Sequence, residues 1–207
     1  KRMDIDLTSQ GKVLKTIEMD GLIPMSTANF MLGVLTDDQS GLNYWWEKQT
    51  GDRLFTNYEP IALKADDIPS RREVMDNFSM LIIDDFDTSQ LSKVQKTSIS
   101  DWIDRGGILL VGTGGNGIKT LKGFSDDILQ VEGGNIYTEV KPKVLEDLAK
   151  TEILTEVPIE LMELNFDGSW KVVAEEDSNP YVLMKKQGRG YIFVSSFDLG
   201  KQPITGW

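Results

Sequence analysis

The chain of 207 residues carries 33 acidic and 22 basic side chains, has a formal net charge of −11, and contains neither cysteine nor histidine. The absence of both residue types excludes disulfides, thiol nucleophiles, thiolate metal sites and every catalytic triad built on imidazole. With 40% hydrophobic residues it has the composition of a globular domain, and its longest basic clusters, such as Arg71-Arg72 and Lys185-Lys186, are too short to bind nucleic acid or an anionic membrane.

Residues 3–19 alternate apolar and polar side chains around Ser9-Gln10-Gly11-Lys12, a pattern that predicts a β-hairpin. We expect residues 1–24 to form a β-ribbon that ends a preceding domain, and residues 25–207 to form one α/β domain. Because the sequence begins with Lys1-Arg2-Met3 and stops at Trp207 without a polar tail, we interpret it as part of a larger protein. No apolar run approaches the ~18 residues of a membrane-spanning helix, so no direct membrane insertion of this segment is expected.

Beyond the hairpin, the apolar pattern predicts strands that alternate with helices. Strands are expected at 29–37, 60–64, 79–87 and 108–115. Helices are expected at 40–51, 70–78 and 88–107. This alternation is typical of a mostly parallel sheet with helices on both faces, so the sequence predicts a flavodoxin-like three-layer α/β/α fold.

The helix at 88–107 has the clearest pattern. We expect Thr88 or Ser89 to cap its start and Gly106-Gly107 to end it. One apolar face is expected in the core, formed by Leu91, Val94, Ile99, Trp102 and Ile103. The aromatic side chains Trp45, Trp46 and Phe197 are likewise expected in the interior and not as platforms for a sugar.

The second half of the chain is less regular. An inserted ribbon is expected at 127–140, a helix at 141–150 and a strand at 169–176. Residues 180–196 predict a hairpin whose turn contains Gly188 and Gly190.

Three predicted strand ends carry polar residues, and parallel strands bring their carboxyl ends to one edge of the sheet. The first group is Asp84, Asp85 and Asp87 with Thr88. These carboxylates suit a hard cation. The alternative, which we expect, is that Asp84 or Asp85 accepts loop N–H groups and that Asp87 assists a helix start, with no metal bound.

The second group is the glycine-rich loop at Thr113, Gly114, Gly115 and Asn116. It lacks the Lys-Ser/Thr pair of a phosphate-binding P-loop. Gly112, Gly114 and Gly117 match the spacing G-x-G-x-x-G, but the residues after Gly117 do not clearly predict a helix. We therefore expect a tight turn and no nucleotide or other cofactor.

The third group is Ser195, Ser196, Phe197 and Asp198. A hydroxyl nucleophile here or at Thr113 would need a carboxylate or lysine as its base, and no surrounding sequence marks one out.

The residues of these groups carry a resemblance to a known family. The stretch "DNFSMLIIDDFDTSQLSKVQKTSISDWIDRGGILLVGTGGN" (76–116), the late "GRGYIFVSSFDLG" and the closing "PITGW" resemble the class I glutamine amidotransferase-like superfamily over residues 27–207. The branch they resemble is catalytically degenerate and occurs in extracytoplasmic domains of membrane-anchored bacterial proteins of unknown function, often from Firmicutes. The resemblance implies the amidotransferase-like topology.

It also implies where the family's reactive residues fall. Active members place a cysteine after the strand that here reads "ILLVGT" and a histidine near the motif that here reads "SSFDLG". The cysteine position falls at Thr113 or Gly114, and the histidine position falls at Asp198. Neither supports thiol-based glutamine hydrolysis, so we expect the fold without the activity.

We therefore expect a non-catalytic structural or binding module of an extracytoplasmic, cell-surface protein. Its partners would be adjacent domains of the same chain and a small-molecule or protein ligand. The ligand would meet a rim formed by Asp84, Asp85, Asp87, Thr88, Gly115, Asn116, Ser196 and Phe197. The alternatives are a small-molecule or carbohydrate-directed enzyme that uses the rim carboxylates, and a cytoplasmic regulatory subunit of a separate catalytic chain.

Overall fold

A computed structural model describes residues 3–19, 30–43, 58–124 and 128–206. The N-terminal hairpin is confirmed: β1 (Met3–Ser9) pairs antiparallel with β2 (Lys12–Met19). Gln10 and Gly11 form its two-residue turn with φ values of 48° and 75°, the left-handed conformation that such tight hairpins need at both positions.

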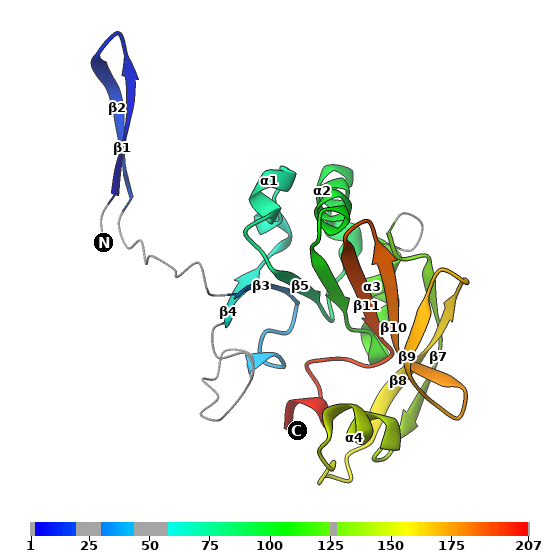
Figure 1. Ribbon diagram of the computed structural model, residues 1–207. Coiled ribbons are helices and arrows are strands. Elements are labelled where there is room, and N and C mark those ends of the chain that lie inside the picture. Colours follow the sequence, from blue (N-terminus) through cyan, green and yellow to red (C-terminus); the bar gives the residue numbers. More distant parts are fainter. Residues whose placement is uncertain (1–2, 20–29, 44–57, 125–127, 207) are drawn as a thin grey trace.

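A seven-stranded sheet in the order β4-β3-β5-β6-β11-β10-β9 forms the centre of the rest of the chain (Figure 1). The parallel strands are β4 (Tyr58–Leu63), β3 (Phe30–Leu35), β5 (Met80–Ile83), β6 (Ile108–Val111) and β11 (Gly190–Ser195). The hairpin partner β10 (Asn179–Gln187) runs antiparallel to both β11 and β9 (Lys171–Glu176). The predicted mostly parallel α/β fold is confirmed.

Helices cover both faces of this sheet, as its alternating side chains require. Leu81 and Ile83 of β5 lie in one core cluster, whereas Ile82 between them lies in the other. The first cluster includes residues of α1 (Arg72–Met75), α2 (Lys93–Asp104) and α3 (Gly117–Lys122). The second includes Leu145 of α4 (Lys143–Ala149) and Leu199 near the C-terminus. The three layers of the predicted fold are therefore present.

A second sheet pairs β7 (Val131–Glu139) with β8 (Ile159–Phe166) in antiparallel fashion. The ribbon expected at 127–140 is thus one strand of this pair, and β8 was not predicted. Leu161 of β8 forms an isolated bridge with Phe197, which brings the second sheet to the carboxyl end of β11.

The helix expected at 88–107 differs from its prediction at its start. Thr88–Gln90 form a separate 3₁₀ turn, and α2 begins after its N-cap Ser92, so neither Thr88 nor Ser89 caps it. Ile99, Trp102 and Ile103 are buried as expected, but Val94 is 58% exposed because it lies in the first turn on the solvent side.

Two further expectations concern helices: one is corrected, and the other falls mainly on residues that the structure does not describe. Gly117 does begin a helix, α3, where the sequence gave no clear sign of one. The helix expected at 40–51, with Trp45 and Trp46, falls mainly outside the described residues. No helix in the described ranges is long and apolar enough to cross a membrane.

Candidate functional site at the carboxyl edge of the sheet

The loops that follow β3, β5, β6 and β11 are joined by backbone hydrogen bonds. The Asp84 N–H donates to Leu35 O at 3.1 Å, and the Gly112 N–H donates to Ile83 O at 2.9 Å. The Thr113 N–H donates to Phe197 O at 3.0 Å. The three predicted groups therefore meet at one edge, together with the end of β3, which the prediction had not included.

Asp84 is a buried structural carboxyl. It is 1% exposed, and its Oδ1 and Oδ2 accept the backbone N–H groups of Leu199 and Gly200 at 3.0 and 3.2 Å. Gly112 leaves room for it, since a Cβ at that position would lie 1.8 Å from Asp84 Oδ1. The predicted role of an N–H acceptor is thus filled by Asp84.

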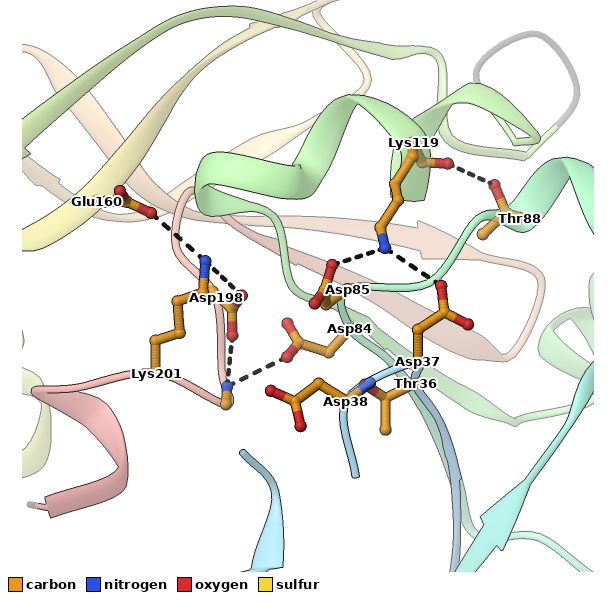
Figure 2. Close-up of polar contacts among 11 residues, drawn as sticks. Thr36, Asp37, Asp38, Asp84, Asp85, Thr88, Lys119, Glu160, Asp198 and Lys201 are labelled. Atoms are coloured by element: carbon orange, nitrogen blue, oxygen red, sulfur yellow. Dashed lines mark hydrogen bonds and ion pairs between the residues drawn. The ribbon is translucent and has the colours of Figure 1, made fainter. Parts of the chain in front are cut away.

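Asp198 lies beside Asp84 (Figure 2). It is 4% exposed, its Oδ1 accepts the same Gly200 N–H at 2.7 Å, and its Oδ2 lies 3.5 Å from Lys201 Nζ. Burial and the neighbouring negative charge of Asp198 raise the pKa of Asp84 to about 8. Both causes favour the neutral form of the Asp84 carboxyl.

A second charged cluster lies at the same edge, around Lys119 of α3. Its Nζ lies 2.8 Å from Asp85 Oδ1 and 3.2 Å from Asp37 Oδ2 (Figure 2). Partial burial alone would lower the pKa of Lys119, but its hydrogen bonds to Asp85 and Asp37 and their charges raise it. Asp85 thus serves as an ion-pair partner and holds a left-handed φ of 46°.

The position that the resemblance assigned to a nucleophile lies inside the protein. Thr113 is fully buried, and its Oγ1 donates to Ser195 O at 2.7 Å. Gly114 has a φ of 69°, and a Cβ there would lie 2.8 Å from the Asp198 backbone nitrogen. Neither position presents a side chain to a substrate.

Three residues of the predicted rim are also buried, which corrects the prediction that they meet a ligand. Thr88 donates to Thr120 O at 2.9 Å and accepts the Gly123 N–H at 2.8 Å, so it ties the 3₁₀ turn to α3. Ser196 is fully buried, and Phe197 is 6% exposed in the second core cluster.

Asp84, described above, is a fourth buried member of the predicted rim, whereas Asp85, Asp87, Gly115 and Asn116 are at least partly exposed. Asp87 is partly exposed and accepts the Ser89 N–H and hydroxyl at 3.0 and 2.6 Å, and these bonds lower its pKa. It therefore assists the start of the 3₁₀ turn, close to its predicted role. Gly115 and Asn116 are exposed in the turn that precedes α3.

Lys119, Asp37, Lys201 and Glu160 were missed by sequence reasoning. Asp37 stands at the end of a predicted buried strand, so the rule that selected Asp84 could have found it. Glu160 lies on β8, which was not predicted, and Lys201 Nζ lies 3.5 Å from its Oε2. No sequence signal connects those two positions.

A cavity of about 390 Å³ opens at this edge beside the ends of β3 and β4. Its lining combines apolar and polar side chains: Thr36, Asp37, Leu63, Lys64, Ala65, Asp66, Phe86 and Gln90. Among the described residues, no group of three or more aspartates and glutamates is arranged to hold a metal ion. The edge is therefore a mixed-charge polar surface next to a small hollow.

The sequence matches no protein-family model, and it matches no curated protein. The structure superposes on the cytoplasmic protein STM1381 from Salmonella typhimurium LT2 with a TM-score of 0.63 and 14% identity, covering 86% of this chain and 94% of that one. A second Salmonella typhimurium protein, the cytoplasmic protein STM3548, gives a TM-score of 0.59 and 11% identity over 100% of this chain and 89% of that one. A putative ThuA-like protein from Bacteroides uniformis ATCC 8492 gives 0.45 and 10% over 86% of each chain. At these identities, the two Salmonella proteins share the fold of this chain.

Proposed function

We propose that this chain is a non-catalytic, amidotransferase-like module that supports neighbouring domains or binds a ligand within a larger bacterial cell-surface protein. One observation carries the proposal: the hydroxyl of Thr113, at the family's nucleophile position, is fully buried and donates to Ser195 O at 2.7 Å. A hydroxyl in this bond joins the ends of β6 and β11 and has no exposed path to a substrate. Catalysis by a side-chain nucleophile needs a base within reach and an accessible acceptor carbon.

The carboxyl pair supports the same conclusion. An acid and a base that act on a sugar must flank the scissile bond. Asp84 and Asp198 are 1% and 4% exposed and converge on one N–H group, so a sugar cannot lie between them. The carbohydrate-directed alternative would have to use the exposed rim carboxylates.

The proposal is tested by assaying glutamine and glycoside hydrolysis by the wild-type chain and by Thr113→Val, which keeps the side chain's shape without its hydroxyl. We expect no turnover from either protein, and a stability loss of about 1–2 kcal/mol in the variant because Ser195 O loses its donor. Turnover by the wild type that disappears in Thr113→Val would overturn the proposal.

Binding is proposed at the surface formed by Asp37, Asp85 and Lys119 next to the 390 Å³ cavity. Alternating charges at a hollow suit a small polar ligand. A thermal-shift screen with metabolites and glycans should give a saturable hit that Asp85→Ala abolishes and that Asp147→Ala, on the exposed face of α4, retains. A hit that survives Asp85→Ala argues against this surface, and no hit favours the supporting role.

The cell-surface location is part of the proposal, with the cytoplasm as its alternative. The two Salmonella proteins of similar fold are named as cytoplasmic proteins, which favours the alternative, whereas the resemblance to membrane-anchored bacterial proteins favours the surface. Protease accessibility of the full-length protein on intact cells separates the two locations.

A further inference from the structure

We propose that Asp84 and Asp198 share one proton and thereby form a pH-sensitive latch that holds the segment Asp198–Lys201 against the carboxyl edge of the sheet. The inference goes beyond the proposed function, because it concerns how this edge is held and does not depend on what the edge binds.

The geometry places two acids on one donor. Asp84 Oδ2 and Asp198 Oδ1 accept the same Gly200 N–H at 3.2 and 2.7 Å, while Asp84 Oδ1 accepts the Leu199 N–H at 3.0 Å. Both carboxyls are at least nine-tenths buried. With both ionised, two negative charges would face one N–H in a site that water cannot screen. A single proton between them removes this repulsion.

The segment packs closely against this edge, and the Asp84 carboxyl holds it by accepting two of its N–H groups, with the Lys201–Glu160 ion pair as a further side-chain contact. Gly200 lies so near Gly41 that a Cβ at Gly41 would be 2.5 Å from Gly200 O. Leu199 packs in the second core cluster. Opening the 198–201 segment would therefore separate the end of β11 from the loops after β3 and β5.

The other charged groups around the pair decide which acid holds the proton. Lys201 Nζ lies 3.5 Å from Asp198 Oδ2 and also 3.5 Å from Glu160 Oε2 on β8, and it stabilises the negative charge on Asp198. Among the described residues, no cation is paired with Asp84, so we assign the proton to Asp84. The placement of these side chains is visible in Figure 2.

Among the described residues, the other carboxyls that follow β3 and β5 are engaged with other partners. Asp37 and Asp85 pair with Lys119. Asp38 accepts the Ser40 N–H at 3.1 Å and the Ser40 hydroxyl at 2.5 Å, and these bonds lower its pKa. None of these groups supplies a second cation to the Asp84 carboxyl.

The direction of the pH effect follows from proton linkage. The closed latch holds one proton up to a pH near 8, whereas an open segment releases it above the ordinary aspartate value. Between these two pH values the closed form binds one proton more than the open form, so raising the pH favours opening. Above pH 8 neither form holds the proton, and the effect levels off.

The first experiment measures the proton directly in the wild-type chain. The side-chain carboxyl carbons of the aspartates are followed by ¹³C NMR between pH 4 and pH 10. We expect one resonance to titrate within about a unit of pH 8, and to be absent from Asp84→Asn. If every aspartate titrates near its ordinary value of about 4, the proposal is wrong.

The second experiment measures the latch by hydrogen exchange of the Leu199 and Gly200 amides, corrected for the intrinsic pH dependence of exchange. Their protection should fall by up to about tenfold per pH unit from pH 5 to pH 8 and then level off. In Asp84→Asn the amide group takes the place of the protonated carboxyl, so protection should be independent of pH.

Asp85→Asn is the matched control. It changes the adjacent carboxyl, and asparagine tolerates the left-handed backbone found there. In this variant, the protection of the Leu199 and Gly200 amides should depend on pH as in the wild type. Flat protection in the wild type, or an unchanged slope in Asp84→Asn, overturns the latch. Neither the NMR titration nor the exchange measurement involves turnover or a ligand. A failure of the latch proposal is therefore distinguishable from a failure of the proposed function.

Discussion

At the carboxyl edge, the missing side chain at Gly112 makes room for the Asp84 carboxyl. A Cβ at this position would lie 1.8 Å from Asp84 Oδ1, which the Leu199 and Gly200 N–H groups hold in place. We predict that Gly112→Ala lowers the free energy of unfolding by about 1–3 kcal/mol, the usual cost of overpacking a buried site. Urea unfolding at neutral pH measures it.

Gly168 provides the comparison for this substitution. It lies in the turn between β8 and β9, and a Cβ there would meet no atom within 4 Å. Gly168→Ala should change stability by no more than about 0.5 kcal/mol. Equal effects at the two glycines would show that Asp84 can move aside and that its burial is not tightly fixed.

For Asp84, the sequence predicted both its place at the end of a strand and its role as an acceptor of N–H groups. For Asp198, it predicted only the place. Asp84 follows a continuous apolar run, so its place at the sheet edge and its bonds to loop N–H groups could be predicted. Asp198 was placed in the third strand-end group and, by the resemblance, at the position of a histidine, and its contact with Asp84 was not predicted. That the two share one N–H donor depends on the parallel pairing of β5, β6 and β11, which brings together residues far apart in sequence. No local pattern encodes such a contact.

At the scale of single elements, the start of α2 is fixed by a capping box. Ser92 Oγ accepts the Gln95 N–H at 3.3 Å, and Gln95 Oε1 accepts the Ser92 N–H at 2.8 Å. Gln95 Nε2 also donates to Ala65 O and Ile68 O at 2.6 and 3.0 Å, which links α2 to the segment after β4.

This double role predicts unequal effects at the two ends of the box. Ser92→Ala should cost about 1 kcal/mol, the usual value of an N-cap. Gln95→Ala should cost more, because it also removes the two bonds to the carbonyls, each contributing about 0.5–1.5 kcal/mol. Chemical unfolding of both variants gives the comparison. Thr97→Ala, which removes one exposed hydroxyl bond to Lys93 O within the same helix, should change little, and a smaller loss for Gln95→Ala than for Ser92→Ala would contradict the link.

We predicted the start of this helix at Thr88 or Ser89, because Asp87-Thr88-Ser89 offers N-cap residues before the true capping box Ser92-x-x-Gln95. Both caps are used in the structure: Asp87 begins the 3₁₀ turn, and Ser92 begins α2. Helix propensity alone does not show which of the two caps begins the longer helix. Strand β8 was missed for a different reason: its buried residues Ile159, Leu161, Met162 and Leu164 break the two-residue period, so the stretch lacks the pattern of a strand.

At the scale of the whole molecule, the chain was predicted to divide near residue 24. The two hairpin strands pair with each other in a sheet of their own. Every hairpin residue whose burial is described is exposed, including Val13, Leu14 and Ile17 at 54%, 65% and 48%. A two-stranded hairpin is at best marginally stable by itself in water. The free energy of unfolding should therefore come from the α/β domain.

A chain that begins at residue 25 should accordingly unfold cooperatively, with a free energy within about 0.5 kcal/mol of the full chain, as for changes outside the core. Paired substitutions give an independent check without truncation. Ile17→Ala in the hairpin should leave stability nearly unchanged, whereas Leu161→Ala in the second core cluster should cost about 2–5 kcal/mol. Urea unfolding followed by tryptophan fluorescence reports all four proteins. If the shortened chain or Ile17→Ala loses several kcal/mol, the hairpin packs against the α/β domain and the predicted division is wrong.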